Sequence, residues 1–67
     1  MIEMYNYRIS GTYYSDDELK HFDEIIRAQS NITAMQIAIG AYAWEESLDG
    51  HSFRLDTIHY DVLIKEK

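Results

Sequence analysis

Histidine, serine and carboxylate side chains are the groups in this chain that could do chemistry, and their spacing argues against a catalytic or metal site. No two of the three histidines lie at the i, i+4 spacing of helical metal ligands, and His51 near Asp49 does not complete a zinc site. Carboxylates adjacent in sequence, such as Glu45 and Glu46, point in different directions and cannot share a proton transfer. No serine lies in a nucleophile-elbow motif, and the glycines form no phosphate-binding loop. We therefore expect no enzyme activity, no metal and no cofactor.

The composition sets the scale of the molecule and the kind of partner that it can attract. The chain has 67 residues and no cysteine, so we expect one domain over 1–67 whose small core has no disulfide support. Twelve acidic against six basic residues give a net charge of -6. Phosphate backbones are bound chiefly through Lys and Arg, so direct nucleic-acid binding is disfavoured, whereas a basic protein surface would be attracted.

No targeting or membrane-spanning segment is visible. No apolar run reaches the ~18 residues of a membrane span, and the first residues lack the basic and apolar regions of a signal peptide. We expect a cytoplasmic protein with no membrane contact.

Hydrophobic periodicity predicts three of the elements that must position these side chains. Residues 4–14 are rich in Tyr, Ile and Thr and alternate with period two, which predicts a strand with a bulge or close approach at Gly11. Residues 57–65 show the clearest alternation and predict another strand. Residues 30–48 predict a helix with Ser30 as N-cap and Gly50 just after its end.

The segment 15–29 is ambiguous. Ser15-Asp16-Asp17-Glu18 has the pattern of a capping box, which favours a helix, whereas the pattern near Ala28 favours a strand leading into the next helix. We expect a strand at 21–29 after a polar connection, 15–20, that holds one helical turn. The fold class is then α+β, with the order β-β-α-β and a three-stranded antiparallel sheet. The alternative is β-α-α-β, with 15–28 helical.

The pattern of Tyr7-Arg8-Ile9-Ser10-Gly11, Phe22 through Ala28, Ala34 and a final alternating strand resembles the small archaeal ribosomal protein LX. The resemblance covers most of the chain and implies the strand-strand-helix-strand fold and an RNA-binding role. The sequence departs from the family's basic character, because no Lys or Arg occurs from Ala28 to Phe53. Many small phage and bacterial proteins share the same pattern.

The predicted helix is apolar nearly all round, which a three-stranded sheet on one side cannot cover. We expect the core stripe to comprise Ala34, Ile37, Ala38, Ala41 and Leu48, with Trp44 on the same side. A second stripe would then form an exposed apolar patch, and such patches usually mark interfaces. Three acidic residues crowd the helix end, where the helix dipole disfavours anions. The predicted partner-binding residues are Met35, Ile39, Tyr42, Trp44, Glu45, Glu46 and Asp49.

These features predict a non-enzymatic protein-protein interaction module that docks on a second copy of itself, as a homodimer, or on another protein. Its concrete form is a small acidic inhibitor of phage type that occupies the basic groove of a host nucleic-acid-handling or defence protein. The alternative is an RNA- or ribosome-associated domain, as the resemblance to LX implies. That alternative requires the basic residues to gather on one face, namely Arg8, Arg27, Arg54, Lys65 and Lys67.

Overall fold

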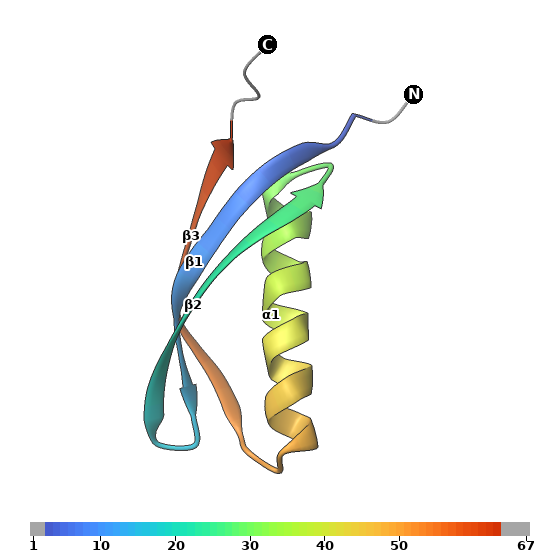
Figure 1. Ribbon diagram of the computed structural model, residues 1–67. Coiled ribbons are helices and arrows are strands. Elements are labelled where there is room, and N and C mark those ends of the chain that lie inside the picture. Colours follow the sequence, from blue (N-terminus) through green and yellow to red (C-terminus); the bar gives the residue numbers. More distant parts are fainter. Residues whose placement is uncertain (1–2, 64–67) are drawn as a thin grey trace.

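A computed structural model describes residues 3–63, which form a three-stranded antiparallel sheet with one helix on one face (Figure 1). The strands are β1 (Tyr5–Ser15), β2 (Glu18–Ala28) and β3 (Phe53–Leu63), and the helix is α1 (Asn31–Leu48). The order β-β-α-β and the α+β fold are confirmed. The alternative with residues 15–28 as a helix is wrong, because 18–28 form a strand.

The connection between the first two strands is a two-residue turn and not the helical turn that the capping-box pattern predicted. Asp16 has a φ of 54°, a left-handed conformation that Asp tolerates better than most residues. With Asp16 and Asp17 forming the turn, β2 begins at Glu18 and pairs with β1 over all eleven residues, from Ser15↔Glu18 to Tyr5↔Ala28. The long-range pairing of β1 with β2 is therefore favoured over the local helical turn that the Ser15–Glu18 capping pattern predicted.

The sheet has the order β2-β1-β3, so β1 lies in the centre and both other strands have a free edge. The third strand begins at Phe53, four residues before the predicted start, and the predicted end at 65 lies outside the described residues. Its pairing with β1 shifts between Thr12 and Tyr13, which leaves Asp56 as an extra residue on β3. This bulge interrupted the alternation on which the sequence prediction depended.

Capping interactions fix both ends of α1. The Ser30 side chain accepts a hydrogen bond from the backbone N–H of Thr33, at 3.2 Å, as the sequence predicted. At the other end, Gly50 has a φ of 77° and its N–H donates to the carbonyl of Ser47 at 3.1 Å. The chain then turns directly into β3.

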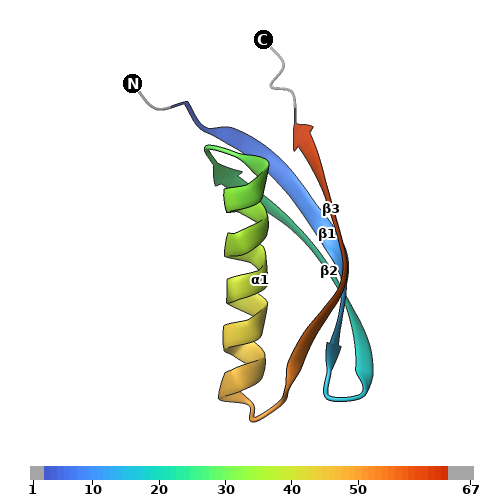
Figure 2. The same cartoon turned by 180° about the vertical axis from the view of Figure 1, so that it is seen from behind.

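Figures 1 and 2 show from two sides that α1 lies over one face of the sheet, and the core residues lie between the two layers. Large aromatic side chains of the sheet pack against small residues of the helix. The buried apolar residues are Tyr7, Ile9, Tyr13, Phe22, Ala28, Ala34 and Ala38. Within the described part of the chain, no helix is long and apolar enough to span a membrane.

The helix does not cover the whole of the sheet. Tyr60 and Val62 pair with Ile9 and Tyr7 and so lie on the helix side, yet they are 47% and 48% exposed. The sheet therefore has an apolar margin at its β3 edge.

Candidate protein-interaction surface

The helix is rotated about its axis from the predicted orientation. Met35 and Tyr42, expected on the exposed stripe, are half-buried and pack against the core, and Ile39 is half-buried as well. Ile37 and Leu48, expected in the core, are 48% and 67% exposed. The physical reason is the bulk of the sheet's aromatic rings, which leaves room for alanines on the facing side of the helix.

A different apolar surface is therefore exposed. We call it the helix stripe: Ile37, Ala41, Trp44 and Leu48. Their spacing of four, three and four residues places them on one face of α1. Trp44, the only tryptophan in the chain, is 64% exposed within the stripe. Of the predicted site residues, Trp44 is thus the one whose apolar surface is clearly accessible.

A groove separates the helix from the free edge of the sheet. Its lining comprises Glu24, Ile26, Ile37, Ala38, Ala41, Tyr42 and Glu45. The Tyr42 hydroxyl donates to the Glu24 carboxylate at 2.5 Å, which fixes both side chains across the groove. Burial, followed by this hydrogen bond, raises the pKa of Tyr42, so the phenol stays protonated and remains a donor at neutral pH. The groove joins the helix stripe to the edge of β2.

Glu46 is buried, with 5% of its surface exposed, and not part of an acidic rim as predicted. Its carboxylate accepts hydrogen bonds from Ser15 Oγ and, at 3.1 Å, from the Tyr13 hydroxyl. His51 Nδ1 lies 3.0 Å and Lys20 Nζ 3.5 Å from its oxygens. The bonds from Ser15 and His51 are the main reason that the pKa of Glu46 is lowered to about 2. The helix end is thereby tied to β1, β2 and the loop before β3.

Ser15, His51 and Glu46 include the residue types of a catalytic triad, but their geometry is not that of one. Ser15 Oγ lies 3.2 Å from His51 Nδ1, and Glu46 Oε1 lies 3.0 Å from the same nitrogen. A triad uses both ring nitrogens, one for the nucleophile and one for the carboxylate. Ser15 also donates directly to Glu46, so its hydroxyl is held by the acid and not activated by the base. The cluster is a structural anchor.

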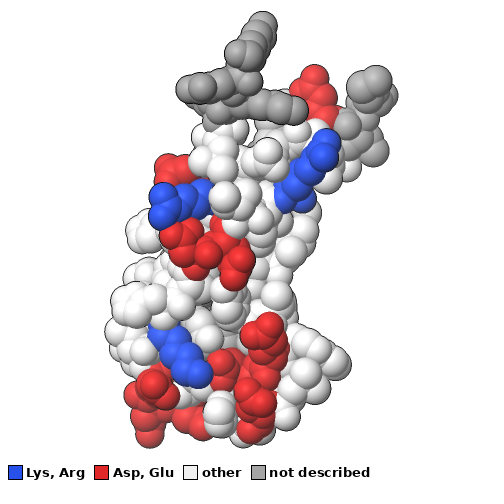
Figure 3. Space-filling view, in the orientation of Figure 1, with Lys and Arg blue, Asp and Glu red and all other residues white. Residues whose placement is uncertain are grey.

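The anchor belongs to an acidic end of the molecule, which comprises Asp16, Asp17, Glu18, Glu45, Glu46 and Asp49. Asp16 accepts hydrogen bonds from the backbone N–H and the hydroxyl of Ser52, at 2.9 and 3.1 Å, so the two loops at this end are joined. These bonds lower the pKa of Asp16 and keep it charged. Figure 3 shows acidic side chains gathered at the lower end of the molecule, where the β1–β2 turn and the end of α1 lie.

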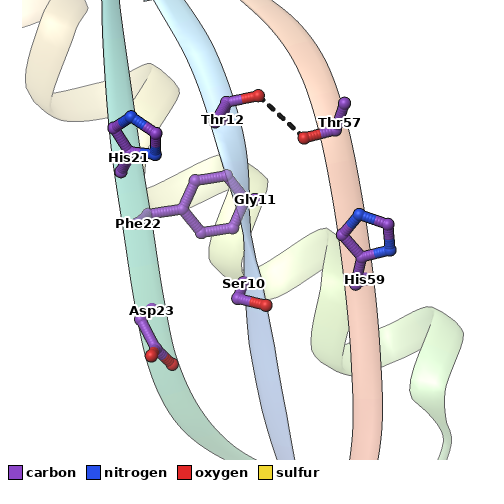
Figure 4. Close-up of a pocket in the computed structure, with 8 residues that line it drawn as sticks. All are labelled: Ser10, Gly11, Thr12, His21, Phe22, Asp23, Thr57 and His59. Carbon is purple, nitrogen blue, oxygen red and sulfur yellow. Dashed lines mark hydrogen bonds between the residues drawn. The ribbon is translucent and has the colours of Figure 1, made fainter.

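The outer face of the sheet, turned away from α1, carries a shallow depression over Gly11 (Figure 4). His21 and His59 flank it, and the hydroxyls of Thr12 and Thr57 are 2.7 Å apart at one side. Within residues 3–63, no three His, Cys, Asp or Glu side chains gather to hold a metal ion. The depression is too open to enclose a small ligand.

All three arginines of the chain lie on this outer face by the pairing register. The Arg8 guanidinium donates two hydrogen bonds to Asp23, at 3.0 and 2.6 Å, and the bonding lowers the pKa of Asp23. The Arg54 guanidinium lies 4.4 Å from the centre of the Tyr14 ring. Lys65 and Lys67, the other members of the predicted basic set, lie outside the described residues.

Sequence reasoning missed the anchor around Glu46. The anchor is built from β1, β2, α1 and the loop before β3, so no local sequence spacing predicts that its five residues meet. They are Tyr13, Ser15, Lys20, Glu46 and His51. One signal was present: an acid near the end of a helix without basic neighbours is unfavourable unless another part of the chain supplies donors. The same oddity was assigned to the surface because the rotation of α1 was unknown.

No protein family, curated protein or solved structure matched this chain.

Proposed function

We propose that this chain is a non-enzymatic protein-interaction module that docks through the helix stripe and the acidic end. The observation that carries the proposal is the exposure of Trp44 and Leu48, at 64% and 67%, on a helix that the fold fully secures at both ends. Tryptophan anchors are typical of interface centres, and an exposed apolar row on a rigid helix fits helix-in-groove or helix-on-helix binding.

The acidic end defines the kind of second surface that the module meets. Glu45 follows Trp44 on α1 and Asp49 caps the end of that helix, and both are exposed. An apolar anchor beside negative charge suits a partner whose apolar contact is bordered by Lys or Arg. The concrete form is a small acidic inhibitor, of the phage type, that covers the basic groove of a nucleic-acid-handling or defence protein.

Affinity capture from a lysate of the cell in which the chain acts tests this proposal, with three variants beside the native protein. Glu45→Lys/Asp49→Lys reverses the exposed charges, Trp44→Ser removes the anchor, and His59→Ser, on the exposed outer face of β3, is the control. The expected result is a basic partner that elutes at moderate salt and is lost with the first two variants only. Binding that survives both, or that is indifferent to salt, contradicts the proposal.

An RNA-associated domain is the second candidate, and one observation favours it: Arg8, Arg27 and Arg54 share the outer face. Asp23 and Asp61 share that face by the same register, and Asp56, the bulge residue, joins them there by accepting a hydrogen bond from Thr12. This balance of charge is why the candidate stands second. Gel retardation of single- and double-stranded RNA at low salt tests it, because phosphate contacts are strongest there. A complex lost in Arg27→Ser supports it, and no retardation at low salt eliminates it.

A further inference from the structure

Within residues 3–63, the outer edge of β2 is long and regular and pairs with no other strand. All eleven residues of β2 pair with β1 without a bulge, whereas the other edge strand, β3, is interrupted at Asp56. A bulge is one of the devices that keep an edge strand from pairing with another chain. The edge that invites a further strand is therefore β2.

The charge sequence of β2 is complementary to itself in one antiparallel register. We propose that two copies of this chain pair through their β2 edges about a two-fold axis at Phe22, which joins the two sheets into one continuous sheet. This proposal rests on the proposed function, since it names a second copy as the occupant of the helix stripe. In this register Lys20 lies opposite Glu24 of the second copy and His21 lies opposite its Asp23.

The same register matches two further pairs, whereas Glu18 falls opposite Ile26. Leu19 and Ile25, which are 45% and 66% exposed on the outer face, lie opposite each other. Arg27 lies opposite Asp17, and no ion pair within residues 3–63 holds this arginine in the single chain. Each pair occurs twice by symmetry, and cross-strand pairs of opposite charge or of large apolar residues are the units that stabilise sheets.

Neighbouring registers lack this complementarity. An axis at Asp23 puts the two Asp23 carboxylates opposite each other, and an axis at Glu24 does the same for Glu24. An axis at His21 places Glu18 opposite Glu24. Like charges directly opposite are destabilising, so the sequence specifies the register at Phe22 and disfavours a slip by one or two residues.

The helix stripe completes the interface. A two-fold axis perpendicular to the sheet places both helices on the same face, each beside the joined β2 edges. The rings of Phe22 and Tyr42 have centroids 5.2 Å apart, so the axis passes at the level of Tyr42 on α1. Ile37 and Ala41 already line the groove along β2. Two copies of the stripe, with Trp44 near the axis, then face each other across the groove.

The antiparallel arrangement also keeps the acidic ends apart. The acidic end lies at the start of β2, and pairing places it beside the end of the second copy's β2, where Arg27 stands. Two acidic ends at opposite extremes of the dimer remain available to a basic partner. A net charge of -6 on each chain is thereby compatible with association.

Charge-swap variants test the register. In Lys20→Glu alone, the substituted side chain faces Glu24 twice in each homodimer, and in Glu24→Lys alone the substituted side chain faces Lys20 twice. An equimolar mixture restores attractive pairs in the heterodimer, although each chain keeps its own internal defect. Sedimentation velocity over a concentration series is expected to show a native dimer. Each single variant should raise its dissociation constant by roughly tenfold or more, and the mixture should return to within about threefold of native.

Lys20 and Glu24 also make contacts within the chain, so circular dichroism of each variant must show the native fold. A second pair avoids those contacts: Leu19→Lys and Ile25→Glu lie on the exposed outer face and complement each other only across the axis. A dimer indifferent to either pair, or a native chain that stays monomeric up to millimolar concentration, overturns the inference. The proposed function fails by a separate result, namely the absence of any other protein whose binding depends on the exposed acidic residues Glu45 and Asp49.

Discussion

At the scale of single residues, Glu46 is the side chain on which the junction of helix and sheet depends. It is the only acid of α1 that the structure buries, and Ser15, Tyr13, His51 and Lys20 all turn toward it. A buried carboxylate is stabilising only when donors replace its lost water. The closed set of donors explains why a charged residue is accepted at this position.

The pKa of Glu46 makes the stability of the protein depend on pH. The pKa is lowered from 4.5 to about 2 in the folded chain, so its contribution is complete above the unfolded value and is lost as pH falls toward 2. Glu46→Gln is expected to lower the thermal midpoint at pH 7 by about 5–10 °C, since amide hydrogen bonds replace charge-assisted ones. The decline of the midpoint as pH falls from the unfolded pKa toward the folded one should become shallower in the variant.

Glu45→Gln is the matched control, because it removes the same charge from the exposed neighbour on the same helix turn. Thermal melts of the three proteins from neutral to strongly acidic pH make the comparison. Asp16 and Asp23 also have lowered pKa values and remain in every variant, so some acid sensitivity persists. If the thermal midpoint falls with acidic pH in the same way in Glu46→Gln and in Glu45→Gln, then the anchor does not contribute to the pH dependence of stability.

Gly11 allows β1 and β3 to approach closely beside the bulge. A Cβ at this position would collide with the Thr57 carbonyl oxygen and lie 2.9 Å from its carbon and 3.0 Å from the Ile58 Cα. Backbone atoms cannot move aside as a flexible side chain would. Gly11→Ala is therefore expected to destabilise the fold by at least about 2 kcal/mol in urea denaturation.

Gly40 provides the matched control for the same substitution. It lies in the middle of α1, and an added Cβ meets nothing within 4 Å. Gly40→Ala is expected to stabilise the fold by about 0.5–1 kcal/mol, because alanine loses less backbone entropy in a helix. Equal effects of the two substitutions would mean that close strand approach at Gly11 is not what requires glycine there.

At the scale of elements, local periodicity predicted the helix and the first strand correctly. The prediction was wrong where contacts between residues distant in the sequence determine the structure. The helix at 30–48 and the first strand at 4–14 differ by one residue from the structure. Ser15 through Glu18 were assigned a helical turn because their capping pattern is local, while the pairing of Tyr14 with Leu19 that excludes it is not. The bulge at Asp56 hid the start of β3 for the same reason.

The rotation of α1 shows the same limit in the candidate site. Ile37 and Leu48 have the hydrophobicity of core residues, and hydrophobicity alone placed them inside. The sheet excludes them, because its aromatic rings fill the space beneath α1, where the fully buried apolar residues of the helix are the small Ala34 and Ala38. Trp44 was predicted as an anchor beside Met35, Ile39 and Tyr42, but it lies on the helix stripe. It is exposed because the other side of α1 is the one that packs against the sheet.

The end of α1 offers a prediction that separates stability from function. Its last turn has no basic residue, and Glu45 is exposed there against the helix dipole. Glu45→Lys is expected to raise the free energy of unfolding by about 0.3–1 kcal/mol at low salt, with the gain vanishing in molar salt. The double variant Glu45→Lys/Asp49→Lys should weaken the binding of a basic partner. A more stable protein that binds less well would show that Glu45 serves binding although it lowers stability. A destabilised Glu45→Lys contradicts the dipole argument.

At the scale of the whole molecule, one helix on three long strands leaves many large apolar side chains exposed, among them Leu19, Ile25, Ile37, Trp44 and Leu48. Small domains bury a low fraction of their surface and gain much from a second subunit. Many of the exposed apolar residues lie together, because the helix stripe, the groove and the β2 edge adjoin one another, whereas Tyr60 and Val62 lie at the opposite, β3 edge. A single association event can therefore cover all three.

The only tryptophan reports that event directly. Trp44 is largely in water in the single chain, and the proposed two-fold axis brings it to the centre of the interface. Its fluorescence maximum is expected to shift to shorter wavelength as concentration rises through the dissociation constant of the dimer, because the indole leaves water. Lys20→Glu should delay the shift to higher concentration, and its mixture with Glu24→Lys should restore it. A maximum that stays constant while sedimentation reports dimers would place the interface away from α1, so that only the strand edge, and not the helix stripe, joins the two copies.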